Sequence, residues 1–139
     1  MDIQRFKQDH IKILNQIEQL RLFAKAGIAT HATDIAQGLE DLSNTVVHHL
    51  AVEDRILYPS LEKGTDPELA ALSKKYQQEM TGVSNPFIRF VRKWTQEGAL
   101  VNNPEGFRSE ANVVLKNVHA RISQENREFY PAVERVYTD

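Results

Sequence analysis

Hydrophobic residues recur along most of the chain at intervals of three and four, which places them on one face of an α-helix. The pattern predicts four amphipathic helices. The apolar positions of the first helix are Ile3, Phe6, Ile13, Leu14, Ile17 and Leu20, and those of the second are Ile35, Leu39, Leu42, Val46, Leu50 and Leu57. Those of the third are Leu69, Leu72, Tyr76, Met80, Val83, Phe87, Phe90 and Trp94, and those of the fourth are Ala111, Val114, Leu115, Val118, Ile122, Phe129, Val133 and Val136.

Turn residues separate these helices. Gly27 is expected to end the first helix, and the second is expected to stop between Pro59 and Gly64. The fourth is expected to begin near Pro104, after the turn-rich stretch GALVNNPEG. No segment alternates convincingly enough to predict a β-strand. We therefore expect an all-α fold, an antiparallel up-down four-helix bundle that forms a single domain over residues 1–139.

The third helix carries two local signals. Thr65 and Glu68 have the spacing of a capping box, which predicts the start of the helix there. Gly82 and Pro86 lie inside its apolar stripe, and a proline in a helix interior removes a backbone hydrogen bond. We therefore expect a kink or a break in the second half of this helix.

Composition excludes several classes of function. The chain has no cysteine, so disulfides, thiolate metal sites and thiol nucleophiles are ruled out. Its 17 Lys and Arg residues against 19 Asp and Glu residues give no polyanion-binding footprint, so a nucleic-acid partner is not expected. No apolar run approaches the ~18 residues of a membrane span, and the N-terminus lacks a signal-peptide core. We expect a cytoplasmic protein with no membrane association. No GxSxG, phosphate loop or HExxH motif indicates a hydrolase, so an enzyme is not the favoured interpretation.

Several ionisable residues lie on the apolar stripes. His10 falls within the stripe of the first helix, His49 and Glu53 within the second, and Glu125 within the fourth. Glu79 flanks the stripe of the third helix. Burying one unpaired carboxylate costs several kcal/mol, so two or three require protonation or a shared positive charge. A divalent metal held by imidazole nitrogens and carboxylate oxygens is one solution.

One motif occurs twice. When HLAVEDRILYP (49–59) is aligned with RISQENREFYP (121–131), four residues are identical in type: Glu53 with Glu125, Arg55 with Arg127, Tyr58 with Tyr130, and Pro59 with Pro131. The second and fourth helices are thus expected to be related about a pseudo-twofold axis. The two copies differ where the first has His49, because the second has Arg121. The tyrosines before the prolines, Tyr58 and Tyr130, are interpreted as packing at the ends of the bundle, with a redox role beside a metal site as the alternative.

The chain resembles the hemerythrin-like (HHE cation-binding) domain family over nearly its whole length. The resemblance rests on the QDH of the first helix, the HHxxxE…YP of the second and the E…FYP of the fourth. It implies a four-helix bundle that holds a non-haem di-iron centre. By this resemblance His10 and His49 would be iron ligands, and Glu53 and Glu125 would be bridging carboxylates.

The chain also departs from that family. The third helix usually supplies a histidine pair or a His/Glu pair, but here it contains no histidine and offers only Tyr76, Gln78 and Glu79. The histidine expected four residues before Glu125 is Arg121. Oxygen carriage by a five-histidine centre is therefore not expected.

Two interpretations remain open. In the first, His10, His49, Glu53 and Glu125, with or without Glu79, hold one or two iron or manganese ions, and the protein senses metal, dioxygen or a related small molecule, or serves in a stress response. In the second, no metal is bound, and the guanidinium of Arg121 neutralises the carboxylates, pairing with Glu125 and Glu53. The bundle would then be a protein-interaction or regulatory module, with a protein partner or a second copy as its ligand.

Overall fold

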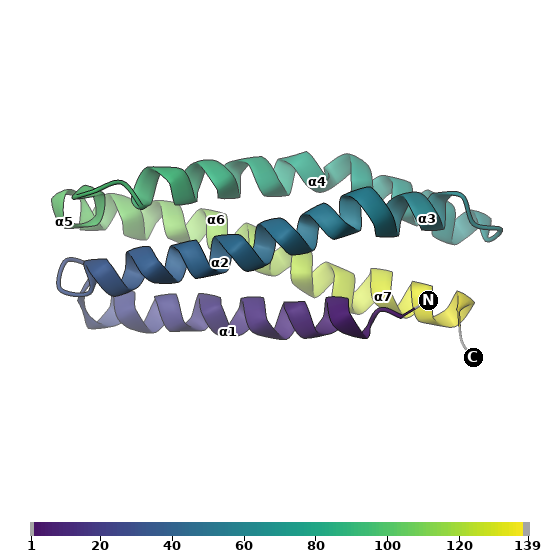
Figure 1. The fold of residues 1–139 in the computed structure, drawn as a ribbon, viewed down its shortest axis with the longest axis horizontal. Coiled ribbons are helices and arrows are strands. Elements are labelled where there is room, and N and C mark those ends of the chain that lie inside the picture. The colour runs from purple at the N-terminus through teal and green to yellow at the C-terminus, as the bar shows by residue number, and fades with distance from the viewer. Residues whose placement is uncertain (1, 138–139) are drawn as a thin grey trace.

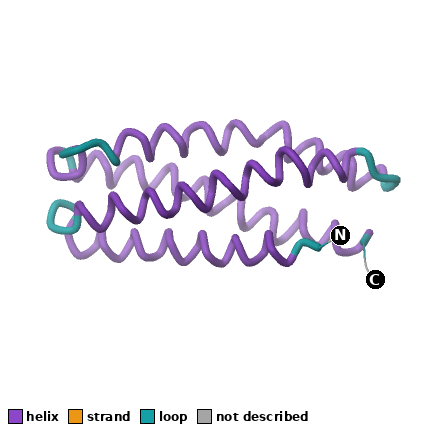
Figure 2. Tube along the Cα trace, in the orientation of Figure 1, coloured by secondary structure: helices purple, strands orange, loops and turns teal. Residues whose placement is uncertain are grey.

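The structure is a computed structural model that describes residues 2–137, and all its long elements are helices packed side by side (Figure 1). The loops gather at the two ends of the molecule, and both termini lie at one end (Figure 2). No strand occurs between residues 2 and 137. The helical segments are α1 (Gln4–Gly27), α2 (Ala32–Val52), η1 (Glu53–Leu57), α3 (Tyr58–Glu62), α4 (Pro67–Trp94), α5 (Ala99–Asn102), α6 (Pro104–Gln124), η2 (Glu125–Phe129) and α7 (Tyr130–Val136).

The segments form four rods, because α2, η1 and α3 follow one another without a loop, as do α6, η2 and α7. With α1 and α4 they make the antiparallel up-down bundle that the sequence predicts. The predicted stripes supply the core, and its largest fully buried side chains include Tyr58, Tyr76, Tyr130, Phe87 and Phe129. α1 packs chiefly against α2, and α4 packs against α2, α3 and α6.

The third rod differs from expectation in two respects. Its N-cap is Asp66, whose side chain accepts a hydrogen bond from the Leu69 amide at 2.8 Å, so the predicted capping box at Thr65 is wrong. The helix also runs without a break through Pro86 to Trp94, so the predicted break is wrong, while the predicted kink stays a prediction. Proline removes one backbone hydrogen bond, whereas the buried aromatic side chains around it anchor both halves of the helix to the core. A further difference is the short helix α5 in the linker, which follows Gly98 at a φ of 80°.

The repeated motif produces the same backbone irregularity twice. η1 and η2 are single π-helical turns that start at Glu53 and Glu125. The amides of Tyr58 and Tyr130 bond to the carbonyls of these glutamates, five residues back, rather than to those four back. A π turn holds about one extra residue and brings positions i and i+5 towards a common face. Each glutamate and the tyrosine after it therefore both enter the core.

Candidate metal centre

Four ionisable side chains from three rods meet in the core. His10 comes from the second turn of α1, His49 from the last turn of α2, and Glu53 and Glu125 from the first positions of the two π turns. None is more than 1 % exposed. One ligand atom from each lies within 4.8 Å of all the others, which is the spacing of a metal-binding group.

The outer nitrogens of both imidazole rings are already engaged. The Nδ1 atom of His10 lies 2.8 Å from Oδ1 of Asn126, and that of His49 lies 3.1 Å from Oδ2 of Asp9. Because these oxygens accept hydrogen bonds, each Nδ1 carries the proton, and the Nε2 of a neutral ring presents its lone pair to the core. The two Nε2 atoms lie 3.0 Å apart. Such outer partners orient histidine ligands in metal sites.

The carboxylates present one oxygen each to the same point. Oε1 of Glu125 lies 3.2 Å from Nε2 of His10, and Oε1 of Glu53 lies 3.3 Å from Nε2 of His49. Both Oε1 atoms are buried, and neither has a hydrogen-bond partner in the described chain. Buried oxygens without partners are costly, so this arrangement requires positive charge at the centre. A metal ion fits these four donors.

Without a metal, protons supply that charge. Burial by itself would lower the pKa of His49, but the close carboxylates of Glu125 and Glu53 outweigh it and raise this pKa to about 10. Burial, together with the charge of Glu125, raises the pKa of Glu53 to about 8. Burial opposes ionisation of Glu125 too, but contacts with His10 and His49 hold its pKa well below the usual range. A metal must therefore displace protons to bind.

Two tyrosine hydroxyls donate hydrogen bonds to the second oxygens of the carboxylates. The hydroxyl of Tyr130 donates to Oε2 of Glu53, and that of Tyr58 donates to Oε2 of Glu125, each at 2.8 Å. Each tyrosine thus bonds the glutamate of the opposite copy of the motif. Burial and the nearby carboxylates raise the pKa of both hydroxyls, which keeps them protonated as donors. The interpretation of these tyrosines as end packing is wrong, because they support the cluster itself.

Arg121 lies beside the cluster rather than within it. Its Nη2 donates to the hydroxyl of Tyr58 and to the carbonyl of Tyr76, each at 2.9 Å, and its guanidinium lies 4.4 Å from the Tyr76 ring centroid. In the described chain it makes no ion pair with Glu53 or Glu125, so the expected direct pairing is wrong. Its charge reaches Glu125 through the hydroxyl of Tyr58.

The third-rod candidates lie outside the cluster. The carboxylate of Glu79 is about half exposed and lies 3.7 Å from Nη1 of Arg121, so it is a partner of that arginine rather than a member of the buried group. The hydroxyl of Tyr76 donates to Glu128 at 2.6 Å, and Gln78 is exposed. His48, the neighbour of His49, is exposed as its position on the helix predicts.

The sequence pattern does not single out Asp9 and Asn126, the outer partners of the histidines. Each adjoins a predicted ligand, since Asp9 precedes His10 and Asn126 follows Glu125. Adjacent helical positions point about 100° apart, so the neighbours of inward-facing residues are predicted to lie at the surface. Their contacts cross from one rod to another, between α1 and α2 and between α1 and η2.

An up-down helical bundle with inward histidine and carboxylate donors defines a class of metal-binding proteins. The family model described as the hemerythrin HHE cation binding domain matches residues 1–133. The chain therefore belongs to this family. No curated protein and no solved structure gave a match. None of the described helices has both the length and the apolar character needed to cross a membrane.

Proposed function

We propose that the protein binds one divalent transition-metal ion, iron or manganese, through His10, His49, Glu53 and Glu125. The observation that carries this proposal is the arrangement of the two Oε1 atoms. Both are buried without a hydrogen-bond partner, and both face the Nε2 atoms of histidines whose Nδ1 atoms are engaged elsewhere. With neutral rings, all four of these atoms are electron-pair donors, so they suit a shared cation better than contact with one another.

The donor set supports the choice of metal. Two imidazole nitrogens and two carboxylate oxygens suit a borderline ion such as Fe²⁺ or Mn²⁺, whereas a site for Mg²⁺ or Ca²⁺ would be built from oxygens. The chain has no cysteine that would favour softer ions. Zinc accepts the same donors and binds more tightly in the Irving–Williams order, so it belongs in any competition experiment.

The tyrosines support one ion rather than two. Bridging of two metals through both oxygens of a carboxylate needs a free Oε2, but Oε2 of Glu53 and Oε2 of Glu125 already accept hydrogen bonds from Tyr130 and Tyr58. The far side of Glu125 is filled by Tyr58 and Arg121. The guanidinium there also repels a second cation. The chain would thus retain one half of a dinuclear centre.

The same geometry favours sensing or a stress response over oxygen transport. Four protein ligands leave positions free on an ion that prefers six, and bound iron supplies affinity for dioxygen and one-electron chemistry. A tyrosine hydroxyl of the chain lies beside the histidine there, with its one proton donated to Glu53. The hydroxyl of Tyr130 lies 3.1 Å from Nε2 of His10 while it donates to Glu53. A small oxidant such as dioxygen or peroxide is the ligand class that this environment suits.

A metal-free regulatory bundle is the second candidate, and one observation favours it. Arg121 is 5 % exposed, and its charge is linked to Glu125 through Tyr58, so part of the carboxylate charge is offset without a metal. Protons on His49 and Glu53 would supply the remainder. In this case the bundle would act through a protein partner or a second copy.

Anaerobic loading with Fe²⁺ or Mn²⁺, followed by desalting and metal analysis, separates the two candidates. We expect one ion per chain in the unaltered protein and a near-ultraviolet charge-transfer band after the iron form meets air. His49→Ala should remove the metal, whereas His48→Ala, its exposed neighbour, should keep it. If the unaltered protein retains no metal and its melting temperature does not respond to either ion, the single-metal proposal is overturned.

A further inference from the structure

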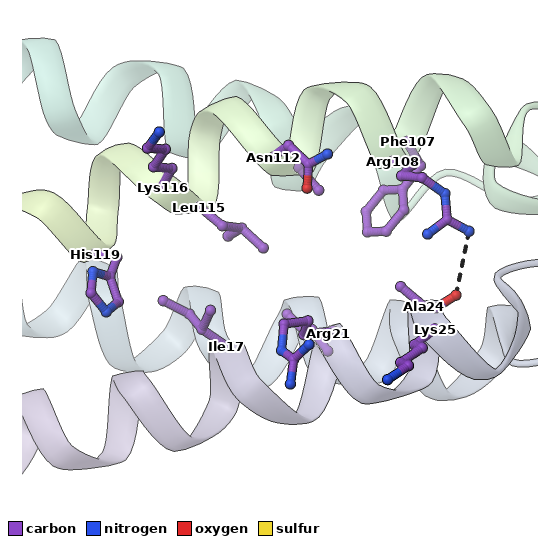
Figure 3. A pocket seen from close by; sticks show the side chains of 12 residues that line it. Ile17, Arg21, Ala24, Lys25, Phe107, Arg108, Asn112, Leu115, Lys116 and His119 are labelled. Atoms are coloured by element: carbon purple, nitrogen blue, oxygen red, sulfur yellow. Dashed lines mark hydrogen bonds between the residues drawn. The ribbon is translucent and has the colours of Figure 1, made fainter.

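A groove runs between α1 and α6, apart from the metal cluster (Figure 3). Its volume is about 510 Å³, within the usual range for ligand sites. None of the four cluster residues lines it. α1 packs much more closely against α2 than against α6, and the seam between α1 and α6 is crossed at one end by a hydrogen bond that Nη2 of Arg108 donates to the carbonyl of Ala24 at 3.5 Å. The apolar part of its lining is Ile17, Leu20, Ala24, Phe107, Ala111 and Leu115.

The polar lining of the groove carries positive charge. The cations Arg21 and Lys25 stand on the α1 wall, and the cations Arg108 and Lys116 stand on the α6 wall beside the polar side chains of Asn112 and His119. No aspartate or glutamate lines the groove. The whole chain has a net charge of −2, so this local excess of cations runs against the overall balance.

The two lysines are the cations that a ligand could engage most readily. Arg21 is paired with Glu18 at 2.7 Å, and Arg108 lies 3.5 Å from Glu105. Lys25 and Lys116 are exposed and form no ion pair with any residue of the described chain. They stand on opposite walls and towards opposite ends of the groove (Figure 3).

We propose that this groove docks an amphipathic α-helix of a partner protein whose apolar stripe is flanked by acidic residues. The apolar lining would take the stripe, and a cation on each wall would pair with an acidic residue on each flank, as in helix-in-groove recognition. Charge complementarity carries the choice of partner, since the groove has cations on both walls and carboxylates on neither. A fatty acid has one carboxylate, which would satisfy one wall and leave the other unused.

The length of the groove sets the length of the helix. Phe107 and His119 are the outermost lining residues on α6. At 1.5 Å per residue they lie about 18 Å apart along the helix axis, which matches a partner helix of about 12 residues. Its anchors would recur at i, i+4 and i+7.

A designed peptide tests the proposal on the full chain. The probe is a fluorescent, lactam-bridged helix of about 12 residues with leucines at i, i+4 and i+7 and glutamates on both flanks. A second peptide has the same leucines with lysines in place of the glutamates. We expect fluorescence anisotropy to show saturable binding of the acidic peptide only, weakening as salt rises. Equal binding of both peptides, or binding of neither, would overturn the proposal.

Variants locate the binding. Lys25→Glu with Lys116→Glu should weaken binding of the acidic peptide by about tenfold or more. Lys74→Glu with Lys75→Glu makes the same change of charge at exposed positions of α4 outside the groove, and it should have little effect. Ala111→Trp, which fills the groove, should abolish binding. Equal loss of binding in the two double variants would contradict the proposal. Sodium dodecanoate tests a fatty acid as the alternative occupant. If it displaces the acidic peptide completely at every salt concentration, the proposal is also contradicted.

Discussion

The Nε2 atoms of His10 and His49 lie 3.0 Å apart in the centre of the bundle, and the Nδ1 atom of each ring is engaged by a residue of another rod. The two rings therefore face each other through the nitrogens that can bind a metal. Two ligands of one metal ion would have this relationship, whereas in the metal-free protein a proton on His49 lies between the two nitrogens.

Replacing Asp9 with alanine should weaken metal binding. Its carboxylate holds the Nδ1 proton of His49, and loss of such an outer partner typically lowers metal affinity about 10- to 100-fold. A chelator-competition titration with Mn²⁺ measures the effect. Asp34→Ala is a matched control, because Asp34 lies 3.4 Å from Nδ1 of His31 at the surface and should leave the affinity unchanged. If the Asp9 variant binds Mn²⁺ with unaltered affinity, His49 is not a metal ligand.

The stability of the metal-free protein should fall as pH rises. The folded-state pKa of His49 is raised from 6.5 to about 10, and that of Glu53 from 4.5 to about 8. Between the unfolded and folded values the folded chain binds more protons, so these groups stabilise it at low pH and lose this contribution as pH rises through that window. The lowered pKa of Glu125 gives a stabilising contribution that is constant above pH 4.5 and is lost only as pH falls below that value.

The metal-loaded protein should show the opposite trend. Protons on His49 and Glu53 compete with the metal, so its stabilising effect should grow from about pH 5.5 to about pH 8.5. Melting temperatures measured in that range with a chelator and with saturating Mn²⁺ test both trends. Parallel curves under the two conditions would show that these residues do not exchange protons for metal.

Arg121→Met should destabilise the fold. The substitution removes two buried hydrogen bonds, to the hydroxyl of Tyr58 and the carbonyl of Tyr76, and should lower the free energy of unfolding by about 1–3 kcal/mol. Denaturant titration gives this value, and Arg127→Met, at an exposed position, should change it by less than about 0.5 kcal/mol.

Restoring a histidine at the arginine position should not create a second metal site. In Arg121→His, Tyr58 still occupies Oε2 of Glu125, so metal analysis should still find one ion per chain. Two ions per chain in this variant would mean that the carboxylates can bridge, contrary to the single-ion proposal.

Tyr130→Phe should cost stability in the same way. It leaves Oε2 of Glu53 buried without its donor, at a cost of about 1–3 kcal/mol. Tyr137→Phe, which removes a hydroxyl that makes no hydrogen bond in the described chain, is the control. The metal-free protein should show the larger loss if a bound ion offsets the charge of Glu53. Equal free energies of unfolding in the two variants would show that the hydrogen bond from Tyr130 to Glu53 does not stabilise the protein.

The periodicity of the apolar residues was sufficient to predict the bundle, because each helix buries a stripe that its own sequence specifies. The same periodicity predicts that His10, His49, Glu53 and Glu125 are buried, since a residue on the stripe of an amphipathic helix faces inward wherever that helix packs. The alignment of the two motifs paired Tyr58 with Tyr130 correctly. It did not reveal that each hydroxyl bonds the glutamate of the other copy.

The remaining features depend on how the rods are placed against one another. Arg121 is on the stripe and could have paired with either glutamate, but the position of Tyr58 and Tyr76 turns its guanidinium away from the cluster. Glu79 lies at the edge of its stripe, and only the rotation of α4 decides that it reaches solvent and Arg121. The sequence by itself determined which faces are buried, because that follows from the period of one helix. The tertiary structure decided which buried groups meet, because a contact between two helices depends on their relative rotation and shift, and neither is encoded in the period of a single helix.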